Sequence, residues 1–401
     1  MRLWIDAAVD WKLTVFGMSP VERHVQAVAR LKGVSEICID GGETMKLPEK
    51  LARKVKIVFR NSAGSASQRL DAYLKSGTEP VLAVAGDTVV DQRLFEFALA
   101  REPGFAAVDK NLAMLSLAPQ ASLPEAATIE ALATALVQSG AVRLLPQAEF
   151  PTFIRRLRRD MPYYLLPVRS EKDRAAAEHF MFWANYKGST DLFTRYVYPF
   201  FVWHLVRPLA RWRVHPNAVS AFNILLGIAA VPAFAMREYV IGFVCAYLMS
   251  VLDSVDGKLA RLTYTDTQLG VRLDHGLDLI HPPFWYLAWA WAVAAGNAGD
   301  PVMIAAVMMV IVYILDRLAV KVYTATFQRA LYAHAKIDTF IRSFIARRNI
   351  NLPIFLVGVI LGYEREAFLL IVAWQVATLV WHTCRIGWIL MFDSEPAAKA
   401  A

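Results

Sequence analysis

The sequence predicts two structural classes in one chain, an N-terminal α/β domain and a C-terminal all-α membrane domain of six helices. Hydrophobic residues make up 56% of the 401 residues, above the roughly 45–50% of soluble domains, and the excess lies after Pro216. Before that point short apolar runs alternate with helical patterns, and after it long apolar segments follow one another. We therefore expect an α/β domain at residues 1–150, a connector at 151–212 and a membrane domain at 213–395.

The first 150 residues have the pattern of strands joined by helices. Apolar periodicity indicates helices over residues 21–31 and 92–100. The predicted strands are short apolar runs at residues 3–5, 36–39, 55–59 and 80–84. Because strands and helices alternate along the chain, we expect a parallel sheet with crossover helices.

The connector is basic and aromatic. It carries an arginine cluster at residues 155–159, and apolar side chains at near-helical spacing follow between Asp191 and Trp212. Mixed aromatic and basic residues on one helix are typical of a segment that lies in the lipid headgroup region. An ordinary helix buried between two domains is the alternative.

Six apolar segments follow, and their flanking charges predict a topology. The connections after the second and fourth segments are rich in Lys and Arg, whereas the other connections are short and poor in charge. By the positive-inside rule, both termini and the basic loops are expected in the cytoplasm, with the chain in the inner membrane. The fifth segment is short for the roughly 20 residues that a bilayer requires. We place the segments at residues 217–236, 239–256, 278–297, 301–324, 350–363 and 366–391.

The net charge of +8 also limits the class of partner. Nucleic acid is one partner for a basic chain, but 11 Trp residues and long apolar runs favour anionic lipid headgroups. We therefore expect membrane lipids, and no nucleic acid, as partners.

Four aspartates stand where the second segment ends and the third begins. Asp253 and Asp256 are three residues apart, and Asp274 and Asp278 are four apart, so each pair shares one face of a helix. Four carboxylates at one membrane depth repel one another unless cations hold them. Oxygen ligands suit Mg²⁺ or Mn²⁺, and these cations suit a diphosphate. The alternative is a set of ordinary interfacial ion pairs.

The residues around the aspartates fit a bulky phosphorylated ligand. Gly257 and Gly270 leave a helix surface without side chains at the point of approach. Arg261, one turn further, has the geometry to bind phosphate oxygens. One carboxylate must also deprotonate an attacking hydroxyl, and Asp278 is the candidate because it lies last and deepest in the pattern.

The pattern DxxDGxxAR, eight residues, then GxxxDxxxD resembles the signature of the CDP-alcohol phosphotransferase family. The resemblance implies a six-helix membrane fold, usually a homodimer, with a site open to the cytoplasm and two divalent ions. It assigns Asp253, Asp256 and Asp274 to one ion, and Asp278 to the second ion and to the role of base. It implies that the CDP moiety is lined by Gly257, Ala260, Arg261 and Gly270.

The implied reaction moves a phospho-alcohol group from a CDP-linked donor to a hydroxyl acceptor, with release of CMP, in phospholipid or related polar-lipid synthesis. Either CDP-diacylglycerol gives phosphatidyl to a polyol, or a soluble CDP-polyol gives its headgroup to a lipid alcohol. The competing class is a non-enzymatic, membrane-anchored scaffold in which the α/β domain binds a partner.

A second resemblance concerns the N-terminal part. KGSTDLFTRYVYP at residues 187–199 is similar to a segment of archaeal fusions between an inositol-phosphate cytidylyltransferase and a di-inositol-phosphate-phosphate synthase. LAVAGDTVVD, with Asp87, resembles the metal-binding strand end of that nucleotidyltransferase fold. Active members begin with a GxGxR loop, but this chain has DAAVDWKLTVFG there, which lacks a backbone nest for a triphosphate. We therefore expect an inactive nucleotidyltransferase-like domain, in which Asp87 either binds metal or caps a helix.

Three further basic residues have two interpretations. Arg317, Lys321 and Arg329 fall on the cytoplasmic half of the fourth segment and just beyond it. They either bind the phosphate of an acceptor or reach outward to lipid headgroups.

Overall fold

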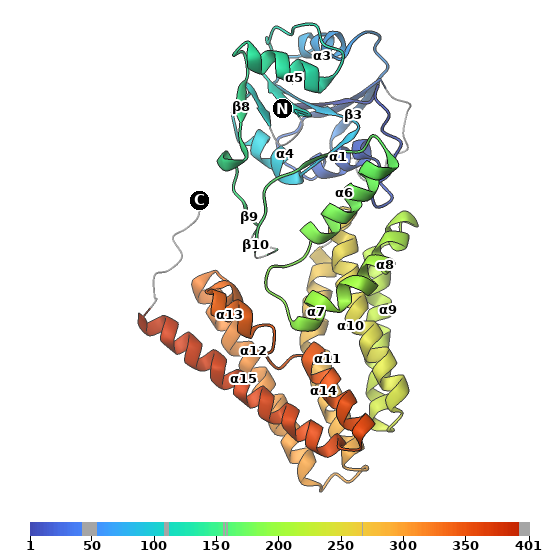
Figure 1. Cartoon of the computed structure of the whole chain (residues 1–401), viewed down its shortest axis with the longest axis vertical. Coiled ribbons are helices and arrows are strands. Elements are labelled where there is room, and N and C mark those ends of the chain that lie inside the picture. The colour runs from blue at the N-terminus through green and yellow to red at the C-terminus, as the bar shows by residue number, and fades with distance from the viewer. Residues whose placement is uncertain (42–53, 108–111, 155–156, 158, 267, 393–401) are drawn as a thin grey trace. The chain divides into compact units, whose positions relative to one another are not determined.

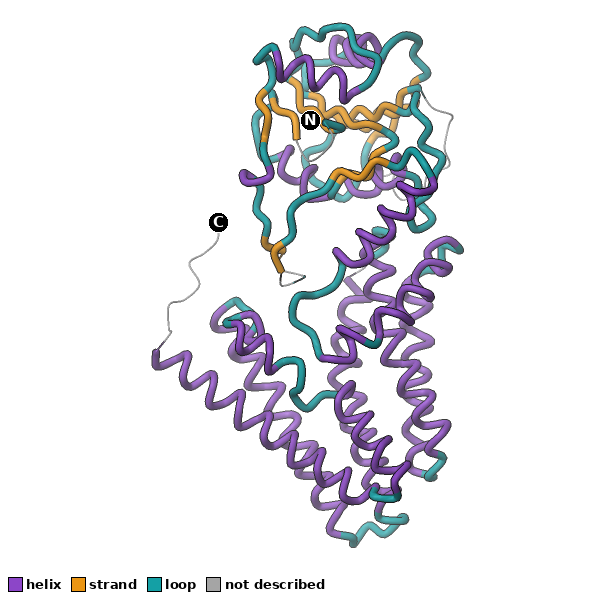
Figure 2. The backbone as a smooth tube through the Cα atoms, viewed as in Figure 1, coloured by secondary structure: helices purple, strands orange, loops and turns teal. Residues whose placement is uncertain are grey.

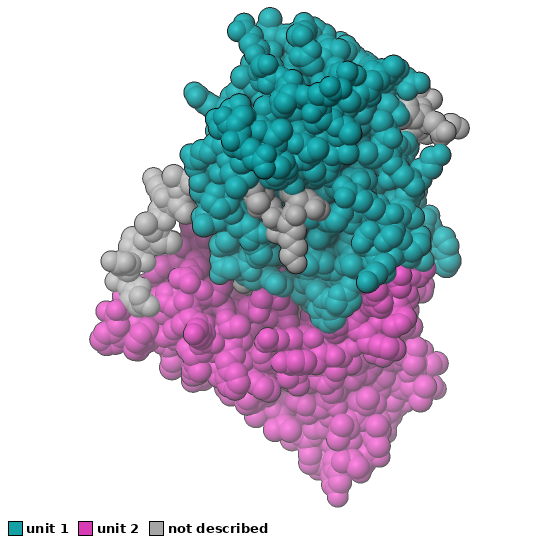
Figure 3. Space-filling view, turned by 45° about the horizontal axis from the view of Figure 1, so that its top comes forward, with its two compact units in different colours: residues 1–186, 210–213, 262–264 teal, residues 187–209, 214–261, 265–401 magenta. Residues whose placement is uncertain are grey.

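The computed structural model describes the chain except residues 42–53, 108–111, 155–156, 158, 267 and 393–401; for residues 267–279 no side chain is described. The chain divides into two compact units (Figure 3). The first unit contains residues 1–186 together with 210–213 and 262–264, and the second contains residues 187–209, 214–261 and 265–401.

The first unit is built on a mixed sheet. Among the described residues, seven strands lie in the order β3-β2-β1-β4-β7-β6-β8. The first four in this order are parallel, as the alternating pattern predicts. The prediction of a wholly parallel sheet is wrong, because β7 runs antiparallel to both β4 and β6. Only six residues separate β6 from β7, fewer than the dozen or so that a crossover between parallel strands requires. The strands are β1 (Arg2–Asp6), β2 (Glu36–Asp40), β3 (Lys56–Arg60), β4 (Val81–Ala85), β6 (Phe105–Ala107), β7 (Met114–Leu117) and β8 (Arg143–Leu145).

Helices cover both faces of this sheet (Figure 1). Since side chains alternate along a strand, Leu3 and Ile5 of β1 face one layer and Trp4 faces the other. The first layer holds α1 (Pro20–Val28) and α4 (Gln92–Leu99), and the second holds α3 (Ala66–Lys75) and α5 (Ile129–Gln138). The unit also contains the small pairs β5–β11 (Thr88–Val90 with Leu165–Pro167) and β9–β10 (Phe153–Ile154 with Arg159–Asp160), a short 3-10 helix (Gln147–Glu149) and helix α6 (Glu171–Ala184).

In its described length the second unit consists of helices joined by loops, without strands (Figure 2). It begins with α7 (Leu192–Tyr196) and α8 (Tyr198–Arg211), so the single amphipathic helix expected over residues 191–212 is divided near Val197. The long helices are α9 (Pro216–Ala235), α10 (Tyr239–Leu262), α11 (Gln268–Val293), α12 (Pro301–Phe327) and α15 (Glu364–Phe392). Between the last two lie α13 (Lys336–Ile341) and α14 (Arg348–Leu361).

Each predicted apolar segment coincides with one of these helices. Within the described residues, four helices, α9, α10, α12 and α15, are long and apolar enough to cross a membrane. Helix α14 has 14 residues and does not reach the length required of a candidate membrane span. Four of the six predicted segments thus meet this criterion within the described residues.

Aromatic side chains fill the interior of the second unit. Trp289 stacks on Phe355 with ring centroids 4.5 Å apart, and the indole of Trp285 donates to the carbonyl of Gly227 at 3.0 Å. Gly358 allows α14 to approach α15, because a Cβ at this position would overlap Ala367. Large apolar side chains, among them Leu225, Ile304 and Ile360, are exposed on the outer faces, as expected for helices that contact lipid.

Candidate active site

Helix α10 presents the first half of the aspartate motif. Asp253 and Asp256 are separated by one helical turn and both line the same cavity. Asp256 is 4% exposed, and its Oδ2 accepts a 2.6 Å hydrogen bond from the Ser220 hydroxyl on α9. Its Oδ1 accepts from the backbone N–H of Gly257 at 2.6 Å. Both carboxylate oxygens of Asp256 are therefore held in a fixed orientation.

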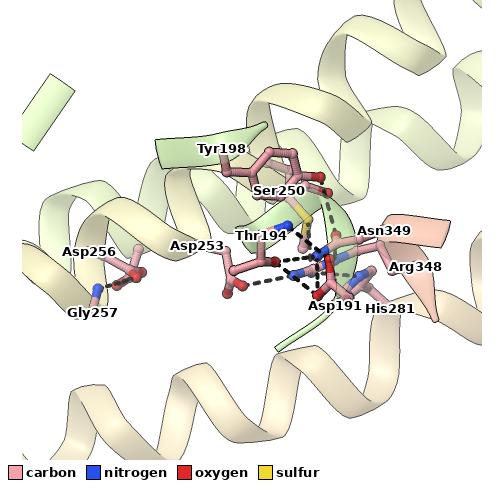
Figure 4. A network of polar contacts seen from close by, with 12 residues as sticks. Asp191, Thr194, Tyr198, Ser250, Asp253, Asp256, Gly257, His281, Arg348 and Asn349 are labelled. Atoms are coloured by element: carbon pink, nitrogen blue, oxygen red, sulfur yellow. Dashed lines mark hydrogen bonds and ion pairs between the residues drawn. The ribbon is translucent and has the colours of Figure 1, made fainter. Parts of the chain in front are cut away.

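Asp253 is paired with an arginine from a distant part of the chain. The Nη2 of Arg348, the first residue of α14, donates to Asp253 Oδ2 at 2.7 Å (Figure 4). The Nη1 of the same guanidinium lies 3.1 Å from His281 Nε2 on α11 and 3.3 Å from the sulfur of Met249. Because a guanidinium only donates, His281 Nε2 is the acceptor in this contact.

A polar network continues from Arg348 towards α7. Asn349 donates from Nδ2 to Asp191 Oδ2 and to the Thr194 hydroxyl, each at 3.1 Å. Its Oδ1 accepts from the Tyr198 hydroxyl at 3.3 Å. Asp191 caps α7 by accepting the backbone N–H of Thr194 at 2.9 Å and is 3% exposed. This network therefore joins the start of α7 to the start of α14.

The pKa of Asp191 is below its ordinary value. Burial alone raises this pKa. The backbone hydrogen bond from Thr194, the charge of Arg347 and further side-chain hydrogen bonds outweigh the burial and lower it. Asp191 is therefore a buried carboxylate that remains ionised at neutral pH.

The cavity beside the aspartates has a volume of about 450 Å³ and two chemically different ends. Its polar lining consists of Ser220, Asn223, Asp253, Asp256 and His281. The rest is apolar and is contributed mainly by Ile224, Gly227, Ile228, Val231, Ile280 and Phe284. Ile228, Ile280 and Phe284 are each more than half exposed on the outer surface of the helices. The cavity thus extends from the carboxylates to the apolar outer face of α9 and α11.

The structure describes the side chains of some of the other motif residues but not of all of them. Gly270, Asp274 and Asp278 fall within the range of α11, but their side chains lie outside those described. On α10, a Cβ at Gly257 would lie 3.3 Å from Arg261 Nη1, so the absence of a side chain at this glycine leaves space for the guanidinium. Ala260, one residue before Arg261, is half-buried.

The donor chemistry of the site fits a hard divalent cation. Asp253 and Asp256 offer oxygen ligands on one helix face, which suits Mg²⁺ or Mn²⁺. No group of three or more His, Cys, Asp or Glu side chains gathers within the described residues. The other two predicted ligands, Asp274 and Asp278, are not among those residues.

The basic residues of the fourth segment have separate surroundings. Arg317 pairs with buried Asp316 at 3.0 Å and lies over the Tyr313 ring, so it does not reach outward to headgroups. Arg329 donates to the carbonyls of Ala333 and His334 beyond the end of α12. Lys321 is exposed.

In the first unit, Asp87 has an arginine as its partner. Arg169 Nε donates to Asp87 Oδ2 at 2.6 Å and the same guanidinium pairs with Glu130. At the neighbouring strand end, Asp6 pairs with Arg69 at 2.7 Å. Both strand-end carboxylates thus already have a cationic partner.

Sequence reasoning missed several residues of the site. Ser220, His281, Arg348 and Asn349 were not predicted, and Asp191 was seen but not assigned a role. One signal was present: an Arg-Asn pair directly precedes the short fifth apolar segment, and an ionisable residue at the membrane end of a helix generally has an interior partner.

Comparisons with known proteins agree with the motif. Residues 213–387 match the family model for CDP-alcohol phosphatidyltransferase. Cholinephosphotransferase 1 from Gallus gallus is 31% identical over 121 residues, which is 27% of this chain and 36% of that protein, so the chain spans little more than a third of this relative. A crystal structure of Mycobacterium tuberculosis phosphatidylinositol phosphate synthase with CDP-DAG bound is 20% identical, with a TM-score of 0.38 over 52% of this chain and 99% of the other. Residues 213–387 of this chain are therefore similar to the CDP-alcohol phosphatidyltransferase family, and the four candidate membrane helices of the described residues lie within or overlap this region.

Proposed function

We propose that the protein is a membrane CDP-alcohol phosphotransferase that acts in phospholipid or related polar-lipid synthesis. It transfers a phospho-alcohol group from a CDP-linked donor to a hydroxyl acceptor and releases CMP. The observation that carries this proposal is the position of Asp253 and Asp256, which line a cavity whose remaining lining is mostly apolar. The match of residues 213–387 to the family supports the same chemistry.

The metal site consists of Asp253, Asp256, Asp274 and Asp278, with two Mg²⁺ or Mn²⁺ ions as the expected complement. When bound, these ions neutralise the diphosphate and stabilise the leaving phosphate. Ser220 keeps Asp256 oriented for this task through its 2.6 Å hydrogen bond.

The remaining motif residues bind and activate the substrates. Gly257, Ala260 and Gly270 give the CDP moiety close access to the helices, and Arg261 binds phosphate oxygens. Asp278 removes the proton from the acceptor hydroxyl. The acceptor oxygen then bonds to the β-phosphorus as the bond between this phosphorus and the bridging oxygen breaks, and CMP leaves.

At least one substrate carries a lipid chain. Support comes from the cavity, whose apolar end opens between exposed Ile228, Ile280 and Phe284 on the outer face of the helices. A chain in the bilayer reaches the aspartates along this path without crossing water. Either donor arrangement satisfies this geometry, because the lipid is CDP-diacylglycerol in one and the alcohol acceptor in the other.

The proposed topology has six membrane helices, namely α9, α10, α11, α12, α14 and α15. Both termini and the active site face the cytoplasm, by the distribution of Lys and Arg. The protein acts as a homodimer. Residues 1–150 form an inactive nucleotidyltransferase-like domain, 151–212 a connector, and 213–395 the catalytic membrane domain. Support for the inactivity comes from the pairing of Asp87 with Arg169.

A substrate screen tests the proposal. Purified protein is incubated with Mn²⁺, extracted lipid and labelled CDP-diacylglycerol or CDP-polyols, and the label is followed into a lipid product. We expect one donor to transfer its label and the Asp253→Asn variant to transfer none. Absence of product from every donor, together with absence of Mn²⁺ binding, would instead favour a non-enzymatic scaffold.

A further inference from the structure

Arg348 is a charged residue outside the motif that contacts a predicted metal ligand, Asp253. Its side chain is only 11% exposed and that of its partner Asp253 is 19% exposed. A guanidinium buried to this extent must donate its hydrogen bonds to protein groups, because the removal of an unpaired charge from water costs free energy.

The three nitrogens of Arg348 have different partners. Nη2 contacts Asp253 at 2.7 Å, Nη1 contacts His281 at 3.1 Å, and Nε contacts Asn349 Oδ1 at 3.4 Å (Figure 4). The partners come from α10, α11 and α14, so the planar fork of the guanidinium joins three helices. A lysine has a single nitrogen at the end of a flexible chain and cannot contact all three groups in this arrangement.

Asn349 fixes this guanidinium from the other side. Its Oδ1 accepts from Tyr198 and Arg348, and its Nδ2 donates to Asp191 and Thr194. The amide therefore uses both of its donors and both of its acceptor positions, which determines its orientation. At the end of this network lies Asp191, a buried, ionised carboxylate that accepts from Asn349.

We propose that Arg348 is a positioning residue for Asp253: it orients this carboxylate and supplies its counter-charge before a metal ion binds. The inference rests on the proposed function, in which Asp253 is a metal ligand. A carboxylate at this depth without a cation destabilises the fold. Arg348 removes that penalty while contacting Oδ2, and the Asn349–Asp191 network keeps the guanidinium in place. Residues that hydrogen-bond to a ligating carboxylate commonly set its orientation in this way.

The difference in stability between metal-free and metal-loaded protein tests this role. The variants are Arg348→Met, Arg348→Lys and a matched control, Arg365→Met. Arg365 also forms an Arg–Asp pair between helices, with Asp300 at 2.6 Å, but it is 44% exposed. The apparent melting temperature of the full chain is measured in EDTA and in saturating Mn²⁺.

In EDTA, Arg348→Met should lower the melting temperature by about 6–15 °C, because it removes a cationic partner from a largely buried carboxylate. Mn²⁺ should restore at least half of this loss, since the ion supplies the missing charge. Arg348→Lys should lie between wild type and Arg348→Met. Arg365→Met should change little, and equally in both buffers, because its guanidinium is 44% exposed and solvent screens its charge.

Two failures have different meanings. If Mn²⁺ stabilises the wild type but Arg348→Met is equally destabilised in both buffers, Arg348 only packs between helices and the inference is overturned. If Mn²⁺ does not stabilise even the wild type, the metal site of the proposed function is itself wrong.

Discussion

The cavity beside the aspartates makes the most specific prediction about substrate. Ile224 on α9 lines this cavity, whereas Leu225, the next residue, is 64% exposed on the outer surface. Ile224→Trp would place an indole in a space of about 450 Å³. We expect the added volume to displace about two methylene groups of a lipid chain, at about 0.8 kcal/mol each. The resulting loss of about 1.6 kcal/mol corresponds to a roughly 15-fold increase in KM for the lipid.

Steady-state CMP release measures this effect. Ile224→Trp is compared with Leu225→Trp, each with a long-chain lipid substrate and with a short-chain analogue that does not fill the cavity. The increase in KM should be confined to Ile224→Trp and to the long chain. An equal loss with both chain lengths, or the same loss in Leu225→Trp, would refute the assignment of the cavity to a lipid chain.

Three further predictions concern single side chains. Ser220→Ala removes the hydrogen bond to Asp256 and should lower kcat about 10-fold or more, since hydrogen bonds to charged groups contribute about 1.5–3 kcal/mol; steady-state rates at saturating Mn²⁺ check this. Asp278→Asn should abolish turnover but leave CDP binding, measured by calorimetry, largely intact. The lowered pKa of Asp191 means that its contribution to stability is present above its ordinary pKa of about 4 and is lost as the pH falls through the lower value in the folded protein. Acid unfolding should therefore show this loss in wild type and not in Asp191→Asn.

The helices and the first aspartate pair follow directly from local sequence. Continuous apolar runs set the bounds of α9 and α12 within a few residues of the prediction, because a membrane helix satisfies its own backbone hydrogen bonds. Asp253 and Asp256 share a helix face because of their spacing. Their assignment to metal remains a prediction.

The partners of these aspartates depend on tertiary packing. Ser220 is 36 positions from Asp256 in the sequence, and Arg348 is 95 positions from Asp253. No periodicity or spacing connects residues so far apart; only the packing of α9 and α14 against α10 brings them together. The mixed sheet has a similar cause. The antiparallel placement of β7 depends on a short connection that the pattern of strands alone did not distinguish from a crossover.

The most direct test of the central claim is CMP release by the purified full chain. The reaction contains a CDP-linked donor and a lipid or polyol acceptor, with Mn²⁺ or with EDTA, and is run for wild type and for Asp256→Asn. We predict CMP formation by the wild type in Mn²⁺ only, and none by the variant. CMP formation in EDTA at the wild-type rate, or undiminished release by Asp256→Asn, would contradict a metal-dependent reaction at these aspartates.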